Sequence, residues 1–322
     1  MTFLALDFGG TKLAAGLLTN DRPQWQGYRR VLSPPNADVS TDLKIMRELA
    51  CELLQGTQPK AIGVSFGGPV DAIAGKVRLS HHVSGWENTP LQEILEAEFQ
   101  VPVSIDNDAN VAALGEYRFG AGQGFDSVFY MTISTGVGGG WILNGLPWRG
   151  IGGMAGEIGH TVVDPNGPVC LCGKRGCLER LASGPYMAQE ARDRLQVEPK
   201  SGPLLRRLAG DRLENITGQA IAQAAAEGDE LAWEILARGA WAVGVAIGNA
   251  ANLINPQRFV LGGGVTNAGE KYWQVVQQVA RETALPEVEF DIVPAELGDE
   301  APLWGAVVLA QDVYKISRDS GE

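Results

Sequence analysis

The feature that most constrains this chain is a glycine-rich turn that follows an apolar strand at three separate places. The first turn follows TFLALDF, the second is STGVGGG after the strand SVFYMTIS, and the third is GGG after RFVL. The first two turns lead into returning apolar strands, LAAGLLT and WILNG. Two strand–turn–strand units far apart in the sequence predict a duplicated architecture. The 42 glycines follow no fixed period, which excludes collagen-like and linker chains.

The composition is that of a globular protein with about two domains. The chain has 322 residues, of which 45% are hydrophobic and 20% charged. Its net charge of −12, without any local run of Lys and Arg, argues against nucleic-acid binding. No apolar stretch is long enough to span a membrane, and the N-terminal segment lacks the basic region of a signal peptide. We therefore expect a cytoplasmic protein without nucleic-acid or membrane partners.

Helical and strand patterns alternate along the chain, which predicts an α/β protein with layered sheets. Helices are expected over residues 41–54 (with Thr41 as N-cap), 91–99, from Asn107-Asp108 onward, 229–253 and 304–316. AIGVSF and VPVSID read as short strands, and the helix over 229–253 is apolar nearly all round, so it should run through a domain interior. We predict one domain from residues 1–115 with 303–322, and a second from residues 116–302.

The first glycine turn has the chemistry of a phosphate site. A turn without Cβ atoms presents successive backbone N–H groups to an anion. Thr11 adds a hydroxyl donor, Lys12 a cation, and Asp7 can hold Mg²⁺ through water. A structural hairpin turn is the alternative for this segment taken alone.

The second and third turns strengthen the nucleotide hypothesis. The second repeats the hydroxyls and glycines, and the third follows a buried strand where a flat base can lie against bare backbone. Neither matches the Walker A pattern or GxGxxG. The candidate nucleotide residues are Asp7, Gly9, Gly10, Thr11, Lys12, Thr135, Gly136, Gly138, Gly262, Gly263 and Gly264.

A cysteine cluster predicts a structural zinc site. His160, Cys170, Cys172 and Cys177 supply one imidazole and three thiolates, which is a complete tetrahedral ligand set for Zn²⁺. In a reducing compartment this spacing favours a metal over disulfides, and unrelated buried thiols are the alternative. If one nitrogen of His160 binds zinc, the other can hydrogen-bond a ligand. The fourth cysteine, Cys51, is interpreted as a buried core thiol.

Taken together, these segments resemble the ROK family of sugar kinases and repressors. The resemblance rests on LALDFGGTK, VSIDNDANVAALGE, TISTGVGGG, GEIGH and CLCGKRGCLE, which occur in the order of the family and cover the chain from Leu4 to about Gly264. It implies an actin-like, ribonuclease-H-like ATPase fold of two α/β domains, with ATP and sugar bound in an interdomain cleft. It also implies ATP, Mg²⁺ and structural Zn²⁺ as cofactors, a role in carbohydrate metabolism such as glycolysis, and a dimeric or tetrameric assembly.

The same resemblance implies roles for individual residues. Asp108 is similar to the catalytic base of the family, which accepts the proton of the attacking sugar hydroxyl. The alternative is that Asp108 is only the N-cap of the following helix. The sugar ligands implied are Gly68, Asn107, Asp108, Glu157, His160 and Glu179.

Two positions depart from the family pattern and leave the substrate open. Gly67 stands where relatives usually carry Pro, and His82 where many carry Asn, while Trp86 fits either a pocket wall or a core residue. Glucose is the first expectation for the hexose. N-acetylglucosamine, N-acetylmannosamine, fructose and allose stay open, because the sugar 2-substituent is read by loop shape.

Two functions of other classes are alternatives to a kinase. A sugar-responsive repressor would carry a DNA-binding segment before the kinase-like region, and here the first glycine turn begins at Gly9, so we expect no such segment. A catalytically silent sugar-binding protein is the other alternative. The presence of Asp7, Thr11, Lys12 and Asp108 favours an active kinase over both.

Overall fold

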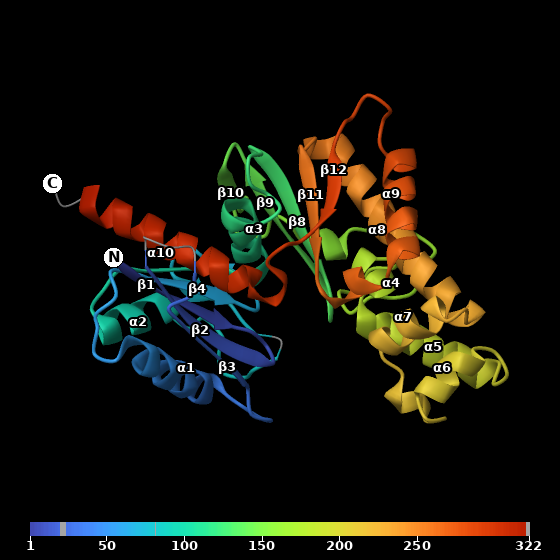
Figure 1. The fold of residues 1–322 in the computed structure, drawn as a ribbon, viewed down its shortest axis with the longest axis horizontal. Coiled ribbons are helices and arrows are strands. Elements are labelled where there is room, and N and C mark those ends of the chain that lie inside the picture. The colour runs from blue at the N-terminus through green and yellow to red at the C-terminus, as the bar shows by residue number, and fades with distance from the viewer. Residues whose placement is uncertain (20–23, 81, 320–322) are drawn as a thin grey trace. The chain divides into compact units, whose positions relative to one another are not determined.

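The computed structural model describes residues 1–19, 24–80 and 82–319, and the chain forms two compact units (Figure 1). The first unit consists of Met1–Asp126, Gly140–Ala155 and Glu296–Glu322. The second consists of Ser127–Gly139 and Gly156–Ala295. The long C-terminal helix therefore belongs to the same unit as the N-terminal strands.

The first sheet aligns the ends of three parallel strands. Its order is β3-β2-β1-β4-β7. The strands are β1 (Thr2–Phe8), β2 (Lys12–Thr19), β3 (Gly27–Leu32), β4 (Ile62–Phe66) and β7 (Val103–Asn107). β1 is antiparallel to β2 and parallel to β4, which is parallel to β7. Phe8 pairs with Phe66 and Phe66 with Asn107, so the chain leaves β1, β4 and β7 along one edge.

Helices cover both faces of this sheet. They are α1 (Val39–Leu54), α2 (Leu91–Phe99), α3 (Asp108–Phe119) and α10 (Ala301–Asp319). Leu4, Leu6 and Phe8 share one core with residues of α1 and α2, whereas Phe3 packs with Ala310 of α10 in a smaller cluster. This follows from the strand geometry, because successive side chains point to opposite faces. Figure 1 shows α1 and α2 on one side of the sheet and α10 on the other.

A second five-stranded sheet repeats the topology of the first. Its order is β10-β9-β8-β11-β12. The strands are β8 (Ser127–Ile133), β9 (Val137–Leu143), β10 (Leu146–Trp148), β11 (Arg258–Gly262) and β12 (Asp291–Pro294). In both sheets three consecutive strands lie side by side, and two later strands extend the sheet beyond the first of them. The predicted duplication is therefore confirmed.

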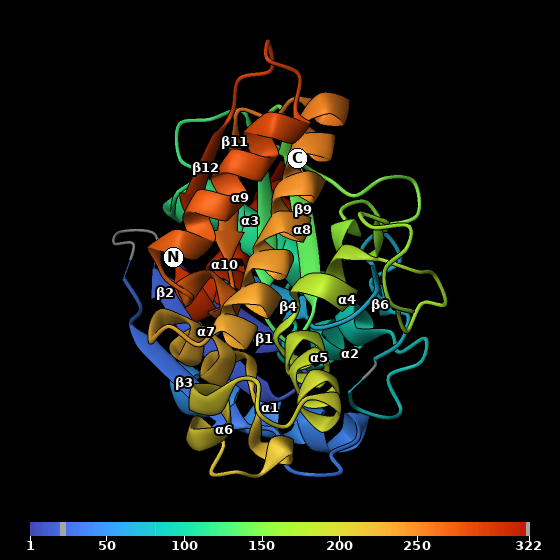
Figure 2. The same ribbon diagram turned by 90° about the vertical axis from the view of Figure 1, so that its right-hand side faces the viewer.

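The second unit is otherwise helical. Its helices are α4 (Leu178–Ala182), α5 (Gly184–Val197), α6 (Pro203–Leu208), α7 (Gly218–Ala226), α8 (Glu230–Ile254) and α9 (Glu270–Thr283). α8 and α9 lie side by side (Figures 1 and 2), and Gly244 and Gly248 of α8 allow the close approach. The prediction that no apolar stretch is long enough to span a membrane is wrong: among the described residues, α8 alone has the required length and apolar composition. Most of α8 is buried, as predicted for a core helix.

Two local predictions for the first helix are wrong. α1 begins at Val39 and its N-cap is Asp38, whose carboxylate accepts the backbone N–H of Thr41 at 2.9 Å. The carboxylate is as good a cap as a threonine hydroxyl and lies where the turn begins, so the helix starts earlier than predicted. Cys51 is exposed rather than buried, because Met46, Ala50 and other residues form the buried face of α1.

Glycines let α3 and α10 cross at backbone contact. A Cβ atom on Gly305 of α10 would lie 2.6 Å from the carbonyl carbon of Val111 in α3. Conversely, a Cβ atom on Gly115 of α3 would lie 2.9 Å from the amide nitrogen of Gly305. No side chain fits at either position without moving a helix. Since α3 starts at Asp108, this crossing also fixes the helix that carries the candidate base.

We predict that Gly305→Ala destabilises the protein by about 1–3 kcal/mol, because the added methyl group overpacks a backbone contact that cannot relax locally. Urea unfolding followed by tryptophan fluorescence measures the change. The matched control is Gly152→Ala, where a Cβ atom would meet nothing within 4 Å, and its effect should stay within about 0.5 kcal/mol. Equal stability of the two variants would contradict the close crossing.

Candidate functional site

Three segments of the first unit meet at the edge where β1, β4 and β7 end. Asp7 and the first glycine turn follow β1, Gly67 and Gly68 follow β4, and Asn107 ends β7. The backbone N–H of Gly67 donates to the carbonyl of Phe8 at 2.8 Å, which joins the first two segments. In open α/β sheets, ligands bind outside the carboxyl ends of the strands. The register of the sheet thus gathers the candidate residues of this unit into one place.

Asp7 is a carboxylate with an unusual protonation preference. The Ser65 hydroxyl donates to its Oδ1 at 2.7 Å. Although part of the residue remains exposed, the protein surrounds the carboxyl group, and this burial raises the pKa of Asp7 to about 7. The hydrogen bond from Ser65 opposes the shift, and the nearby charge of Asp108 adds to it. A bound cation would favour the ionised form of such a group.

The first glycine turn is tight and carries a paired lysine. The amide of Gly9 donates to the carbonyl of Lys12 at 3.0 Å, and a Cβ atom on Gly9 would lie 2.8 Å from that oxygen. Lys12 Nζ lies 3.4 Å from Oδ2 of Asp299, and Arg30 donates to the same oxygen at 3.0 Å. The hydrogen bond from Arg30 holds the pKa of Asp299 below its usual value, with a smaller contribution from Lys12. Lys12 is therefore present at the turn but already engaged.

Asn107 orients Asp108. Its side-chain oxygen accepts the N–H of Ala109 at 3.0 Å and so caps α3. Its amide nitrogen donates to the carbonyl of Gly68 at 3.0 Å and to Oδ1 of Asp108 at 2.9 Å. The N-cap is therefore Asn107, and Asp108 is the first residue of the helix. The alternative in which Asp108 is the N-cap is wrong.

Asp106 and Arg149 support this turn and were missed by sequence reasoning. The Asp106 side chain is only 3% exposed, and its Oδ2 accepts Nε–H of Arg149 at 2.5 Å. Its Oδ1 accepts the amide of Asn107 at 2.8 Å and the side chain of Asn110 at 3.2 Å. A buried carboxylate of this kind needs a charged partner. The sequence does show an acidic residue, Asp106, at the end of a buried strand. No local pattern predicts that its partner is an arginine far away in the sequence.

The second unit contains a cavity of about 870 Å³ that unites the second and third glycine turns. Its walls include residues of both turns and the starts of α5 and α7, among them Ser134, Thr135, Gly184, Pro185, Gly218, Gly264 and Gly269. Gly262 pairs with Thr132 in the parallel register of β11 and β8, so the two turns follow neighbouring strand ends. Gly263 has φ +90°, and a Cβ atom there would lie 2.7 Å from the carbonyl carbon of Ile133. Only glycine fits this contact.

Glu179 contacts the second glycine turn. Its Oε2 accepts the backbone N–H of Val137 at 3.0 Å, and a Cβ atom on Gly136 would lie 2.7 Å from the same oxygen. Glu179 is part of α4, directly after the cysteine cluster. The structure therefore couples a predicted sugar ligand to the predicted nucleotide turn.

Glu157, another predicted sugar ligand, is exposed and precedes the short 3₁₀ helix Ile158–His160.

The four predicted metal ligands come together. Their ligand atoms all lie within 4.8 Å of one another. Sγ of Cys170 is 3.9 Å from Nδ1 of His160, and the Sγ atoms of Cys172 and Cys177 are 3.5 Å apart. Tetrahedral zinc with bonds of about 2.3 Å to sulfur sets ligand atoms about 3.8 Å apart. The cluster fits Zn²⁺, and with all four positions taken by protein the metal would be structural.

Backbone hydrogen bonds hold together the two ends of the loop that carries these ligands. The amides of Val163 and Asp164 both donate to the carbonyl of Gly176, at 2.9 and 3.2 Å. Gly176 has φ +66°, and a Cβ atom there would overlap the Asp164 carbonyl. Burial raises the pKa of the Cys177 thiol to about 12, so only a bound cation would keep this sulfur ionised at neutral pH.

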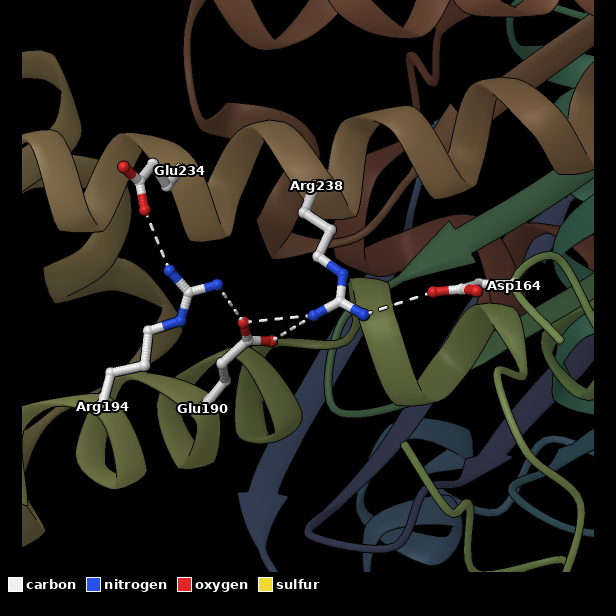
Figure 3. A network of polar contacts seen from close by, with 5 residues as sticks. All are labelled: Asp164, Glu190, Arg194, Glu234 and Arg238. Carbon is white, nitrogen blue, oxygen red and sulfur yellow. Dashed lines mark hydrogen bonds and ion pairs between the residues drawn. The ribbon is translucent and has the colours of Figure 1, made fainter. Parts of the chain in front are cut away.

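A chain of ion pairs ties the base of this loop to two helices (Figure 3). Arg238 of α8 lies 3.3 Å from Asp164 and 3.3 Å from Glu190 of α5. Arg194 of α5 lies 2.7 Å from Glu190 and 2.9 Å from Glu234 of α8. Glu190 and Asp164 are largely buried, so their ion pairs are less screened by solvent than a surface pair. The network holds the metal loop against α5 and α8.

The comparisons with known proteins agree with these motifs. The ROK family model matches residues 3–313. A glucokinase of Halalkalibacterium halodurans is 40% identical over 311 residues, covering 94% of this chain and 93% of the relative. An N-acetylmannosamine kinase of Escherichia fergusonii is 35% identical over 315 residues, covering 97% and 99%.

The solved structures extend this similarity to the fold. A ROK glucokinase from Streptomyces griseus, solved with glucose and AMPPNP, has a TM-score of 0.82 and 33% identity, covering 97% of this chain and all of that one. The chain thus has the predicted actin-like ATPase fold, built from two mixed α/β sheets.

We predict that Asp7→Asn flattens the pH dependence of stability. With a folded-state pKa of about 7, Asp7 keeps its proton in the folded protein after the unfolded chain has lost it. The stability linked to this proton is complete below about pH 4 and is lost as the pH rises through about 7. Melting temperatures measured without Mg²⁺ from about pH 5 to about pH 8 should therefore fall more for the native protein than for Asp7→Asn. Parallel curves would show that Asp7 ionises freely.

We predict that Cys172→Ser lowers both zinc retention and sugar affinity, since one of four ligands is lost and the loop is released. Metal content after dialysis against a chelator is measured by atomic emission, and sugar binding by calorimetry. The matched control is Cys51→Ser, on the exposed face of α1, which should keep its metal. Undiminished zinc in Cys172→Ser would remove this residue from the ligand set.

Proposed function

Because the chain belongs to the ROK family, we propose that it is an ATP-dependent hexose kinase that transfers the γ-phosphoryl group to the sugar 6-hydroxyl. The observation that carries the proposal is the common edge of β1, β4 and β7. The strand register places Asp7, the first glycine turn and the oriented carboxylate of Asp108 along this edge. Phosphoryl transfer needs these parts: an anion site, a place for the metal that accompanies ATP, and an acceptor for the hydroxyl proton.

Asp108 is the proposed catalytic base. Its Oδ1 is held by the Asn107 amide and by the backbone N–H of Ala109, at 2.9 and 2.8 Å. Because these donors fix the carboxylate, it can accept the sugar proton without first reorganising. Asn107 itself is held by the Gly68 carbonyl, so the base is positioned by two segments of the sheet edge.

ATP would be bound through the glycine turns. In the second unit, the 870 Å³ cavity has the size of a small-molecule site, and bare backbone from the second and third turns lines it. In the first unit, the turn at Gly9 and Gly10 would contact phosphate, and Asp7 would hold Mg²⁺. Mg²⁺ supplies charge neutralisation of the phosphates when bound.

The proposed sugar ligands are Gly68, Asn107 and Asp108 in the first unit and Glu157, His160 and Glu179 in the second. Carboxylates and amides suit a pyranose, because each pairs with adjacent hydroxyls. Nδ1 of His160 faces the cysteine cluster, which leaves Nε2 for a sugar hydroxyl. The zinc would then hold the imidazole in place and take no part in the transfer.

Glucose is the proposed preferred hexose, since relatives named glucokinase are similar over nearly the whole chain and one was solved with glucose. N-acetylmannosamine is the second candidate, because a kinase of that sugar has comparable identity. A regulator without kinase activity is the alternative of another class. The cytoplasm fits this proposal, since its reducing conditions keep closely spaced thiols available to a metal.

We predict that Asp108→Asn keeps its sugar affinity while turnover falls by about 10²–10⁴-fold, the usual contribution of a positioned base. ADP release with Mg·ATP is measured against glucose, N-acetylglucosamine, N-acetylmannosamine, fructose, allose and mannose. Asp312→Asn, on an exposed turn of α10, is the matched control and should be unchanged. A sugar-dependent rate that survives in Asp108→Asn would exclude it as the base. No turnover of any sugar by the native protein would favour the regulator.

A further inference from the structure

His82 covers the first glycine turn with its imidazole ring. A Cβ atom on Gly10 would lie 2.7 Å from Cγ of His82 and 3.0 Å from its Cβ. The ring therefore occupies the space in which a side chain at position 10 would lie. His82 is itself exposed, so the ring has one side on the backbone of the turn and another open to solvent.

Leu79 lies against the neighbouring segment of the same edge. A Cβ atom on Gly68 would lie 2.8 Å from the carbonyl oxygen of Leu79. Gly68 is the residue whose carbonyl accepts the Asn107 amide beside Asp108. Leu79 thus lies beside the segment next to the proposed base, and His82 lies against the proposed phosphate turn.

The backbone of His82 and Val83 is held by contacts that do not involve the imidazole ring. The Ser80 hydroxyl accepts the backbone N–H groups of His82 and Val83, at 3.2 and 3.1 Å. Val83 and Trp86 are buried in the core below, and Trp86 donates to Asp42 at 3.3 Å. Within the described part of the chain, no hydrogen bond to the His82 ring is found. As far as the described residues are concerned, the ring nitrogens are therefore available to a ligand.

The two cationic side chains beside the turn, Lys12 and Arg30, are already paired. Lys12 and Arg30 share Asp299, at 3.4 and 3.0 Å. A phosphoryl group in transfer is stabilised by donors placed where its negative charge gathers. An imidazole supplies an N–H donor in either protonation state. Among the described residues around the turn, His82 combines contact with the Gly10 backbone and a ring N–H without a hydrogen-bond partner.

We propose that His82 is a catalytic residue that donates an imidazole N–H to an oxygen of the phosphoryl group during transfer, which rests on the proposed kinase function. In this step the bond from phosphorus to the ADP oxygen breaks, and a bond to the sugar oxygen forms. The hydroxyl proton passes to Asp108, and the proton of His82 stays on its nitrogen. The donor stabilises the transferring group and is not consumed.

The first test is steady-state kinetics of His82→Ala and His82→Gln with the best hexose. The alanine variant should lose about 10–100-fold in kcat, with the KM of the sugar within about threefold, as expected for a lost transition-state donor. Glutamine keeps an N–H donor and should recover part of the rate. Ser84→Ala, in the same segment, is the matched control, and melting temperatures check folding. A kcat within twofold of the native value, or a change confined to the sugar KM, would overturn the proposal.

The second test does not depend on turnover. Imidazole ¹⁵N resonances, assigned with His82→Gln, are followed while Mg·AMPPNP and glucose are added, and separately with Mg·ADP and glucose. The His82 signal should shift with AMPPNP and much less with ADP, which lacks the γ-phosphate. The same response to both nucleotides, or none, would overturn the contact. If the native protein turns over no sugar yet shows the AMPPNP-specific shift, the kinase proposal fails and the phosphate contact stands.

Discussion

The candidate site of the first unit depends on the parallel pairing of β1, β4 and β7 in a single register. A shift of one residue would turn alternate side chains to the opposite face. Phe8 and the strand residues before it would then leave the core shared with α1 and α2, so hydrophobic burial holds the register. Because of that register, Gly9 and Gly10, Gly67 and Gly68, and Asn107 follow each other along one edge. The chemistry at this edge is a consequence of how the apolar strands pack.

Two buried carboxylates, Asp106 and Asp7, lie at the sheet edge that the register forms. Asp106 and Asp7 are carboxylates in a region where ionised groups are unfavourable unless partnered. Asp106 is satisfied by Arg149, Asn110 and the Asn107 amide, whereas Asp7 has the Ser65 hydroxyl and a raised pKa. Asp106, with all its partners present, stabilises the turn at Asn107. Asp7 would be ionised more readily if a cation were bound beside it. This difference in partners fits a structural role for Asp106 and a ligand-binding role for Asp7.

The sequence was most informative where chemistry is local. Apolar runs with glycine turns predicted both hairpins and the duplication, and ligand spacing predicted the His160 and cysteine cluster, because neighbours along the chain had to be neighbours in space. Sequence reasoning failed where two neighbouring residues could fill the same role, or where the partner of a residue lies far away in the sequence. Asp38 and Thr41 both fit an N-cap, and Cys51 lies in a helix whose pattern leaves its buried face ambiguous. Arg149 and the packing of His82 on Gly10 arise only from tertiary structure.

The two sheets share a topology, but the residues at their strand ends differ in chemistry. In the first sheet the strand ends carry acidic groups beside glycine, which suits a metal and the acceptor hydroxyl. In the second sheet the corresponding turns carry hydroxyls and glycine over a large cavity, which suits a nucleotide. The closed ligand set of the metal loop has no open position for a substrate, so its value lies in rigidity. Glu179, which leaves that loop to accept the Val137 amide, connects this rigid loop to the second glycine turn. Under the proposed function, a metal bound by the cysteine cluster would therefore influence the nucleotide and sugar sites through a single carboxylate, Glu179.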